Sequence, residues 1–364
     1  MIKSDCIYFK GDKPCRYKIL CEGCPHYTPF PCRILIIKCR AQGDVLRTTT
    51  LLTGLKRRYP DSHISWVVDG ESIDLLENNP LIDRVMPYTW TQWLRLEVER
   101  FDVLICLDKE PESIALASRV RAESRFGFGM NEFGGLIPFN PAAAYSAQLG
   151  VDDELKFRKN QKTYQQIIYE TAEIPYQNDR YVFSLDDAHR KPAGAFFRAK
   201  QIDRRRTAIG FNTGAGVKFE TKQWPPEHYI ELARLLKERM DANIFLLGGR
   251  RETALNRDLE EKIGSGVYNT GNHHSLLEFS GFLDAMDVIV TSDTLGMHLA
   301  LALGKKVVAL FGPTCPQEID MYGQGVKLFA NAACSPCYRQ TCESMECMRT
   351  IKPSQVLTAL EKIL

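Results

Sequence analysis

Three polar loops could do chemistry, because each follows a short apolar run and carries glycine, carboxylate, hydroxyl or lysine side chains. They span residues 39–44, 213–222 and 292–298. Loops that leave a buried strand are where α/β proteins place ligand-binding groups. Two other segments, near the two ends of the chain, carry four grouped cysteines each. The sequence therefore indicates ligand binding at the loops and metal binding at the cysteines.

The first loop contains Gly43 and Asp44, directly before a segment whose apolar residues predict a helix over 45–58. Glycine lets a ligand or another backbone segment approach closely. A carboxylate beside that ligand could accept a proton as a general base. The other interpretation is that Asp44 only caps the helix, and the spacing by itself favours the cap.

The second loop begins with Thr213 and Gly214 and reaches Lys222. The backbone N–H groups of a glycine-rich loop, a threonine hydroxyl and a lysine ammonium could together hold a phosphate. The spacing matches neither the Walker A loop nor the G-x-G-x-x-G fingerprint. An ordinary flexible loop is the alternative.

The third loop has the sequence Ser-Asp-Thr-Leu-Gly-Met-His over 292–298 and opens an expected helix. The free N–H groups and the dipole of that helix could receive a diphosphate, with Thr294 adding a hydroxyl. Asp293 could instead cap the helix, and His298 could face the ligand or pack inside the protein. Two loops suited to binding phosphate in the same half of the chain indicate a phosphate site there more strongly than either loop alone.

Four cysteines near the C-terminus follow the spacing C-x2-C-x4-C-x4-C in a polar segment: Cys334, Cys337, Cys342 and Cys347. Four thiolates at this spacing suit a tetrahedral structural site for zinc or iron. Buried free thiols or a disulfide pair are the alternatives.

Four more cysteines near the N-terminus follow the looser spacing C-x8-C-x5-C-x2-C: Cys6, Cys15, Cys21 and Cys24. With four protein ligands, a metal here would have no open catalytic position. A [4Fe–4S] cluster also fits the number of ligands. The N-terminal residues show no apolar leader, so we expect a cytoplasmic protein whose thiols stay reduced.

The composition is that of an ordinary globular protein, with 364 residues, 44% of them apolar, 25% charged and a formal net charge of +2. The length suggests two domains and an appendage, and the composition excludes a disordered, collagen-like or small disulfide-stapled protein. The near-neutral charge argues against nucleic acid as a partner, and no apolar run is long enough to span a bilayer. The charge is uneven, because residues 1–60 contain twelve basic and four acidic residues.

Alternating apolar and amphipathic segments position the loops. Strands are expected at 33–38, 64–68, 103–107, 207–211, 244–247, 288–290 and 306–311, and helices at 45–58, 226–239, 252–263 and 294–303. This βαβ rhythm predicts parallel sheets with helices on both faces. It weakens between 125 and 200, which divides the chain into a Cys-rich segment 1–32, a domain 33–190 and a domain 205–364. We expect the two α/β domains to face each other across a cleft at the carboxyl ends of their strands.

The order of these motifs resembles glycosyltransferase family 9, which comprises the bacterial ADP-heptose heptosyltransferases. The resemblance lies in Ile-Leu-Ile-Ile-Lys-Cys-Arg-Ala-Gln-Gly-Asp-Val-Leu-Arg-Thr-Thr at 34–49, Asn-Pro-Leu-Ile-Asp-Arg-Val at 79–85, Lys-Gln-Trp-Pro at 222–225, Leu-Gly-Gly-Arg-Arg-Glu at 247–252 and the segment 292–298. The tail Cys-Ser-Pro-Cys at 334–337 is similar too. The Cys-rich segment 1–32 lies outside the common family pattern.

The resemblance implies a GT-B fold, with two facing Rossmann-like doubly wound domains, and an inverting transfer of heptose from ADP-heptose without a metal cofactor. Asp44 matches the family's proposed base, Lys222 the cation that supports the diphosphate, and Glu252 a carboxylate that holds the ribose. The remaining donor-binding residues would be Thr213, Gly214, Asp293, Thr294, Gly296, Met297 and His298. Zinc or iron at one or both cysteine groups would be structural.

Acceptors in this family are often phosphorylated sugars of the lipopolysaccharide core at the cytoplasmic membrane face. The resemblance therefore implies an acidic glycan or glycolipid acceptor and peripheral contact with the inner membrane. Arg40 and Arg47 could attract such an acceptor, whereas the basic cluster 56–58 more simply forms a solvated helix face. Two alternatives stay open: a protein acceptor of the autotransporter type, and a non-catalytic protein that binds a sugar nucleotide.

Overall fold

The apolar runs of the first half form a six-stranded sheet in the computed structural model, which describes residues 1–11, 13–216 and 218–364. The strand order is β3-β2-β1-β4-β5-β6, and only the β5–β6 pair is antiparallel. The strands are β1 (Arg33–Ile37), β2 (His63–Val68), β3 (Arg84–Pro87), β4 (Arg100–Cys106), β5 (Arg121–Met130) and β6 (Leu136–Pro138). The helices of this half are α1 (Gln42–Thr48), α2 (Thr50–Arg58), α3 (Trp90–Leu96), α4 (Pro111–Arg119), α5 (Ala143–Gln148) and α6 (Tyr164–Thr171). Helices cover both faces of this sheet. Its central strands are therefore buried on both sides, which matches their continuous runs of apolar residues.

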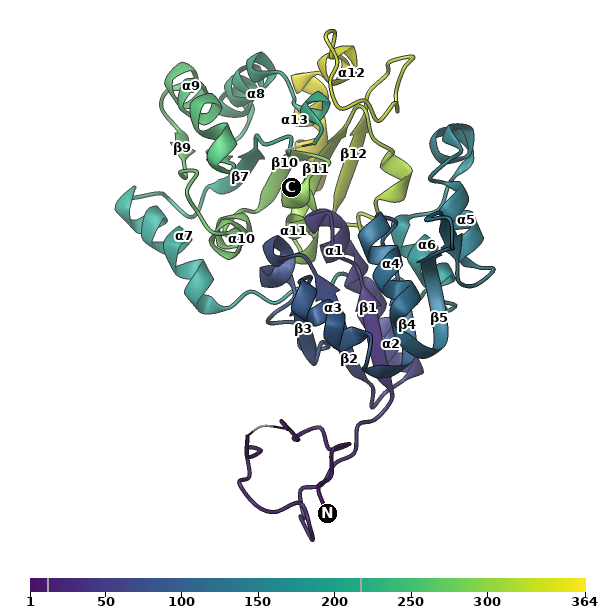
Figure 1. The fold of residues 1–364 in the computed structure, drawn as a ribbon. Helices are drawn as coiled ribbons and strands as arrows, with labels where there is room; N and C mark the ends of the chain where they lie inside the picture. Colours follow the sequence, from purple (N-terminus) through teal and green to yellow (C-terminus); the bar gives the residue numbers. More distant parts are fainter. Residues whose placement is uncertain (12, 217) are drawn as a thin grey trace.

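The second half forms another six-stranded sheet, in which every neighbouring pair is parallel. Its order is β12-β11-β10-β7-β8-β9. The strands are β7 (Thr207–Asn212), β8 (Ala242–Leu247), β9 (Val267–Asn269), β10 (Val288–Ser292), β11 (Lys306–Phe311) and β12 (Gly325–Phe329). The helices are α7 (Asp187–Ala199), α8 (Pro226–Arg239), α9 (Thr253–Ile263), α10 (Leu276–Asp284), α11 (Leu295–Ala302), α12 (Glu346–Thr350) and α13 (Pro353–Ile363). The expected architecture of two doubly wound α/β domains is confirmed (Figure 1).

Both sheets have the Rossmann order 3-2-1-4-5-6 when the strands are numbered within each domain. The order reverses between β1 and β4 in the first sheet and between β7 and β10 in the second. Loops that leave the strands at such a point run in opposite directions and open a crevice, which is where this fold class binds ligands. The three loops predicted from the sequence follow β1, β7 and β10, so all three lie at these points.

The single helix expected over 45–58 is divided in two at Thr49. The Thr49 hydroxyl donates to the Leu46 carbonyl at 2.6 Å and accepts the Val182 N–H at 3.0 Å. The hydroxyls of Thr48 and Thr50 also bond back to carbonyls of the preceding turn. Such back-bonding competes with the helical ladder and favours a bend.

Helix α7 lies mostly in the interval between the two expected domains, 33–190 and 205–364, and it packs against α10 of the second domain. Arg190 Nε donates to Asp284 Oδ2 at 2.8 Å across this contact. A Cβ added at Gly281 would lie 2.1 Å from the His189 carbonyl oxygen. The absence of a side chain at Gly281 therefore lets the two helices approach closely.

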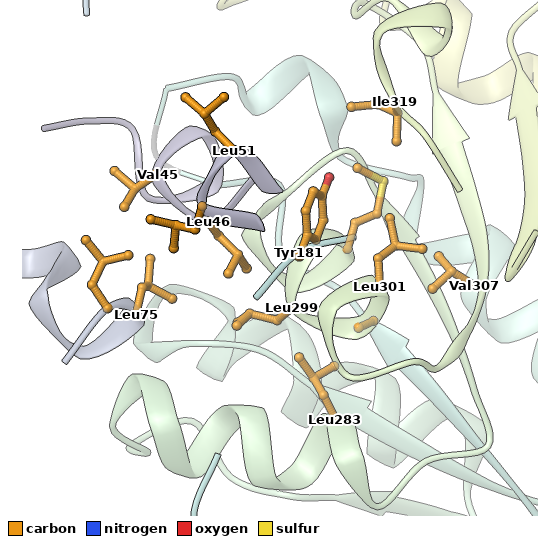
Figure 2. Packing of buried hydrophobic residues seen from close by; sticks show 14 of the residues in the cluster. Val45, Leu46, Leu51, Leu75, Tyr181, Leu283, Leu299, Leu301, Val307 and Ile319 are labelled. Atoms are coloured by element: carbon orange, nitrogen blue, oxygen red, sulfur yellow. The ribbon is translucent and has the colours of Figure 1, made fainter. Parts of the chain in front are cut away.

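The two domains meet through an apolar core that is continuous between them (Figure 2). Helix α1 packs against α11, so Val45 and Leu46 from the first domain join the same buried cluster as Leu299 and Leu301 from the second. An apolar contact of this kind restricts relative domain motion. It holds the loop after β1 opposite the loop after β10.

Residues 1–32 form an irregular appendage that projects from the body at the N-terminal end of β1 (Figure 1). In the described part of this segment the backbone pairing of β type is one isolated bridge between Cys6 and Pro29. Across the described residues of the whole chain, no helix combines the length and the apolar character needed to cross a bilayer.

Candidate active site

A cavity of about 960 Å³ opens where the carboxyl ends of the two sheets meet. Its walls come from the loops after β1 and β4 of the first domain and after β7 and β10 of the second. Of the residues predicted from the sequence, those that line it are Asp44, Lys222, Asp293, Thr294 and His298. The fold therefore brings the proposed base and the proposed phosphate-binding groups to one cavity.

Asp44 lies in the first turn of α1, and its side chain is 40% exposed to the cavity. The capping residue of α1 is Ala41, and no side chain caps the helix. The capping interpretation of Asp44 is therefore wrong. Asp44 Oδ1 accepts from Arg47 Nη1 at 3.4 Å, and its Oδ2 lies 4.0 Å from Lys38 Nζ.

These two cations control the charge of the Asp44 carboxyl. Desolvation in the cavity would raise the pKa of Asp44, but Lys38 and Arg47 outweigh it and hold the pKa below its usual value. Asp44 is therefore a carboxylate at neutral pH. It is free to accept a proton from a group that enters the cavity.

Lys38 is held beside Asp44 by Asp108, a buried carboxylate at the end of β4 that sequence reasoning missed. Lys38 Nζ donates to Asp108 Oδ1 at 2.6 Å, and the Cys39 N–H donates to Asp108 Oδ2 at 2.5 Å. Burial opposes the charge on Lys38, but Tyr164, Asp108 and Asp44 raise its pKa above the usual value. The signal available in the sequence was a lysine at the end of an otherwise apolar strand.

Arg47 links the base to the second domain. Its guanidinium stacks 3.8 Å from the centroid of the Tyr164 ring, and Nη2 donates to the Glu318 carbonyl at 3.1 Å. The residue is 7% exposed. Its contacts with Asp44, Tyr164 and Glu318 hold it on three sides. Arg47 therefore couples the position of Asp44 to the domain interface. It also lines the cavity, and its attraction of an acceptor stays a prediction.

On the opposite wall, Lys222 and Asp293 form a close pair. Lys222 Nζ donates to the Asp293 carbonyl at 2.7 Å and to its Oδ2 at 3.1 Å, and each side chain is 15% exposed. Burial would raise the pKa of Asp293, but Lys222 and His298 lower it to about 2. The Ser292 hydroxyl donates to the Lys222 carbonyl at 2.6 Å, which fastens the second loop to the third. The ammonium is thus held at the N-terminus of α11.

His298, in the third predicted loop, lies against Gly43 in the first. A Cβ at Gly43 would lie 3.0 Å from the His298 ring, so the absence of a side chain there makes room for α11. Tyr181 Oη and His298 Nδ1 are hydrogen-bonded at 3.1 Å. Burial and Arg47 lower the pKa of His298 to about 4, so the ring is neutral at pH 7. It can accept or donate a hydrogen bond in the cavity but supplies no charge.

The other predicted donor-binding residues do not line the cavity themselves. Thr213 is buried and donates to Asn256 Oδ1 at 2.6 Å. Glu252 accepts the Gly249 N–H at 2.8 Å, and its carboxyl carbon would lie 3.2 Å from a Cβ on Gly214, so both lie beside the β7 loop.

Two of the predicted donor contacts have packing roles. A Cβ on Gly296 would lie 2.5 Å from Asn212 Nδ2, so this glycine serves the packing of α11 on β7. The Met297 side chain is fully buried in the apolar core, and the donor-binding role of this residue stays a prediction.

Two lysines on the first-domain wall were not singled out from the sequence. Lys109 follows β4 and Lys156 precedes α6, and both line the cavity. Burial and the charge of Lys156 lower the pKa of Lys109 to about 8. Together they add positive charge to the first-domain part of the cavity lining.

All twelve cysteines are free thiols. In the C-terminal group, the neighbours of Cys347 include Cys334 and Cys337, whereas Cys342 Sγ lies 3.5 Å from Ser344 Oγ. Among residues 1–11, 13–216 and 218–364, no three Cys, His, Asp or Glu side chains lie close enough to share one ion. The assignment of these eight cysteines to metal stays a prediction.

The chain matches a family model described as glycosyltransferase family 9 (heptosyltransferase) over residues 90–348. The lipopolysaccharide heptosyltransferase 1 of Campylobacter coli is 26% identical over 299 residues, which cover 78% of this chain and 84% of that protein. The protein of the same name from Pseudomonas aeruginosa is 24% identical over 367 residues, which cover 91% of this chain and 98% of that protein.

Solved structures have the same two-domain arrangement. A family 9 glycosyltransferase from Veillonella parvula superposes with a TM-score of 0.70 at 20% identity, and the match covers 91% of this chain and 96% of that one. The Escherichia coli ADP-heptose lipopolysaccharide heptosyltransferase II superposes with a TM-score of 0.67 at 20% identity, covering 91% and 98%. This likeness establishes the GT-B fold.

Proposed function

The chain belongs to glycosyltransferase family 9, and from that premise we propose that it transfers a heptose from ADP-heptose to a hydroxyl of a lipopolysaccharide core acceptor. One observation carries the proposal. Asp44 and the Lys222–Asp293 pair line a single cavity between the two domains, one on each wall. A base facing a phosphate-binding wall is the arrangement that direct sugar transfer requires.

In the proposed step, the acceptor hydroxyl attacks the anomeric carbon of the heptose from the face opposite the leaving group. The new C–O bond forms as the bond to the phosphate oxygen breaks, and the hydroxyl proton passes to the Asp44 carboxylate. The configuration at the anomeric carbon is inverted. Lys38 and Arg47 keep Asp44 ionised before the step, and their charge limits how strongly it holds the proton.

The ADP leaving group gains negative charge as its bond breaks. Lys222, held against Asp293, and the backbone N–H groups at the start of α11 provide fixed positive potential at that wall. Thr294 adds a hydroxyl at the same helix start. We propose that these groups stabilise the diphosphate without a divalent ion and that Glu252, beside Gly214, holds the ribose.

The acceptor would enter along the first-domain wall, where Lys109 and Lys156 suit a phosphorylated sugar. This charge and the names of the relatives favour a lipopolysaccharide acceptor over a protein acceptor. A protein that bound the donor without catalysis would have no use for an ionised Asp44 facing the diphosphate wall.

The charge of Lys109 makes acceptor binding depend on pH. Because its pKa is about 8, Lys109 is charged below that pH and neutral above it. We expect the KM for a phosphorylated acceptor to rise about fivefold as the pH passes 8, the effect of losing an ion pair of about 1 kcal/mol. The KM for the donor should stay constant over the same interval in steady-state assays.

The Lys109→Arg variant is the matched control, because arginine stays charged at every accessible pH. Its acceptor KM should be flat between pH 7 and pH 9.5. The role of Lys109 would be disproved if this variant and the wild type had the same pH profile.

We propose that the enzyme contacts a membrane surface through α3, since its acceptor would be a lipid. Trp90, Leu94 and Val98 follow each other at four-residue spacing and are 68%, 50% and 70% exposed. Trp90 and Leu94 share one face of α3 (Trp90–Leu96), and Val98 lies in the turn directly after it. An exposed apolar surface with a tryptophan suits the membrane interface.

Cosedimentation with anionic vesicles tests this contact. The variant Trp90→Ser/Leu94→Ser should bind about tenfold more weakly, because each buried side chain contributes about 1.5 kcal/mol or more at full burial. Phe133→Ser, at another exposed apolar position, is the control and should bind like the wild type. Equal binding by all three proteins would exclude α3 as the contact.

The C-terminal cysteines are proposed to hold a structural zinc or iron ion. Cys334, Cys337 and Cys347 are neighbours in the fold, and Cys342 would complete a tetrahedral set after a shift of its loop. Elemental analysis of the purified protein is the test. Folded protein free of metal would contradict the assignment.

A further inference from the structure

The N-terminal segment 1–32 encloses a cavity of its own, of about 330 Å³, far from the active site. Four of the five cysteines of the segment line it: Cys6, Cys15, Cys21 and Cys24. The rest of the lining is largely apolar and aromatic side chains of the same segment. Cys32, the remaining cysteine of this region, does not line the cavity, so the grouping is selective.

Each of the four cysteines begins a tight turn. In every case the cysteine carbonyl accepts the backbone N–H three residues on, from Phe9 at 2.9 Å, Lys18 at 3.0 Å, Cys24 at 3.3 Å and Tyr27 at 3.3 Å. The bond that closes such a turn joins the carbonyl of its first residue to the N–H of its fourth residue. The N–H of the third residue stays available. It can donate to a side-chain acceptor at the first position, as in an Asx turn. The turns thus place each of the four cysteines at a reversal of the chain.

The segment has little else to hold it in one conformation. Its regular pairing is one bridge, and Met1, Ile2 and Leu20 are 93%, 69% and 85% exposed. The side-chain contacts within the segment include a hydrogen bond from Tyr27 to Asp5 and the stacking of Tyr17 on His26. Segments of this size cannot bury enough apolar surface to fold alone and usually need a metal or disulfides.

We propose that Cys6, Cys15, Cys21 and Cys24 bind a thiophilic metal centre that folds residues 1–32. Thiolates select zinc or iron–sulfur centres among biological metals. The thiols surround the cavity and do not converge on one point, so the centre either draws the four turns inward around one ion or fills the cavity as a cluster. Gly11 and Gly23, at φ +79° and +67°, allow the chain to reverse between the ligands.

The proposed centre is structural and does not depend on the glycosyltransferase assignment. The segment joins the N-terminal end of β1, where the Cys32 carbonyl accepts the His63 N–H at 2.8 Å. The active site lies at the other end of the same five-residue strand, roughly 17 Å away. No ligand of the centre can therefore touch the reacting groups.

Metal and sulfide analysis of the full chain, purified without oxygen, tests the proposal. The variants are Cys15→Ser/Cys21→Ser, the control Cys32→Ser, and Cys337→Ser/Cys342→Ser, which separates any metal of the C-terminal group. We expect the Cys15→Ser/Cys21→Ser variant to lose either about one zinc per chain or about four iron and four sulfide, in addition to any metal that the C-terminal variant loses, and we expect Cys32→Ser to keep the full content. Zinc without sulfide identifies a single ion, and iron with sulfide identifies a cluster.

Limited trypsin digestion gives a second measurement that does not depend on metal content. Cleavage after Lys10, Arg16 and Lys18 should be about tenfold faster or more in the Cys15→Ser/Cys21→Ser variant and in chelator-treated protein than in untreated protein. Cys32→Ser should digest like the wild type. Equal metal content in the wild type and the Cys15→Ser/Cys21→Ser variant, or disulfides among the four cysteines in the native protein, would overturn the proposal.

Discussion

The Asp44→Asn variant should lose on the order of 10²–10⁴ in kcat while its affinity for ADP stays within about twofold of the wild type. Asparagine keeps the size of the side chain but cannot accept the hydroxyl proton. Asp44 belongs to the first-domain wall, where the acceptor would enter, and the diphosphate contacts come from the other domain, so donor binding should be retained. Single-turnover transfer assays and calorimetric titration with ADP measure the two quantities separately.

Asp69→Asn is the matched control. Asp69 also lines the cavity, but its carboxylate pairs with Arg40 at 2.5 Å and lies outside the proposed chemistry. This variant should keep kcat within about threefold, the effect of an exposed pair. An Asp44→Asn enzyme with undiminished kcat would show that another group removes the proton.

The Lys222→Met variant should lose on the order of 10²–10³ in kcat at saturating donor. Its ammonium lies against Asp293 at the start of α11, where the leaving diphosphate gains charge. Because this charge develops in the transition state, the loss should fall mainly on kcat and less on the KM for ADP-heptose. Steady-state kinetics over a range of donor concentrations separate the two parameters.

Lys218→Met is the control, since Lys218 lines the same cavity and belongs to the same loop but is exposed. We expect it to change kcat by less than about threefold. The Lys222→Met substitution leaves the Asp293 carboxylate without its cation. A Lys222→Met/Asp293→Asn double variant also removes this carboxylate, so it shows how far the unpaired charge lowers the stability of the protein. If the double variant regains the wild-type kcat, Lys222 acts by neutralising Asp293 and not by supporting the leaving group.

Much of the fold could be predicted from the sequence, because its signals are local. The runs at 207–211 and 306–311 are buried strands, and Pro226 begins α8 as the rule for proline at a helix start predicts. The three loops could be placed because each follows such a run directly. Helix α7 was missed, since its pattern is weak and its packing against α10 depends on contacts almost 100 residues away.

The candidate site could be predicted only in part, because its electrostatics depend on distant pairs. Asp44 and Lys222 are marked by their loops, but the Lys38–Asp108 pair joins residues seventy positions apart. Nothing in the local sequence shows that Gly43 makes room for His298 of the other domain. The burial of the Met297 side chain could not be predicted either, because a motif gives the order of residues and not which helix face meets the core.

The most direct test of the account is to incubate the purified protein with ADP-heptose and a lipopolysaccharide core acceptor and to measure both products. We expect ADP release to equal the heptose added to the acceptor, with an inverted anomeric configuration, and to require the acceptor. The Asp44→Asn variant should abolish both signals together. Tight binding of ADP-heptose with no transfer to any core acceptor, or transfer with retention of configuration, would contradict the account.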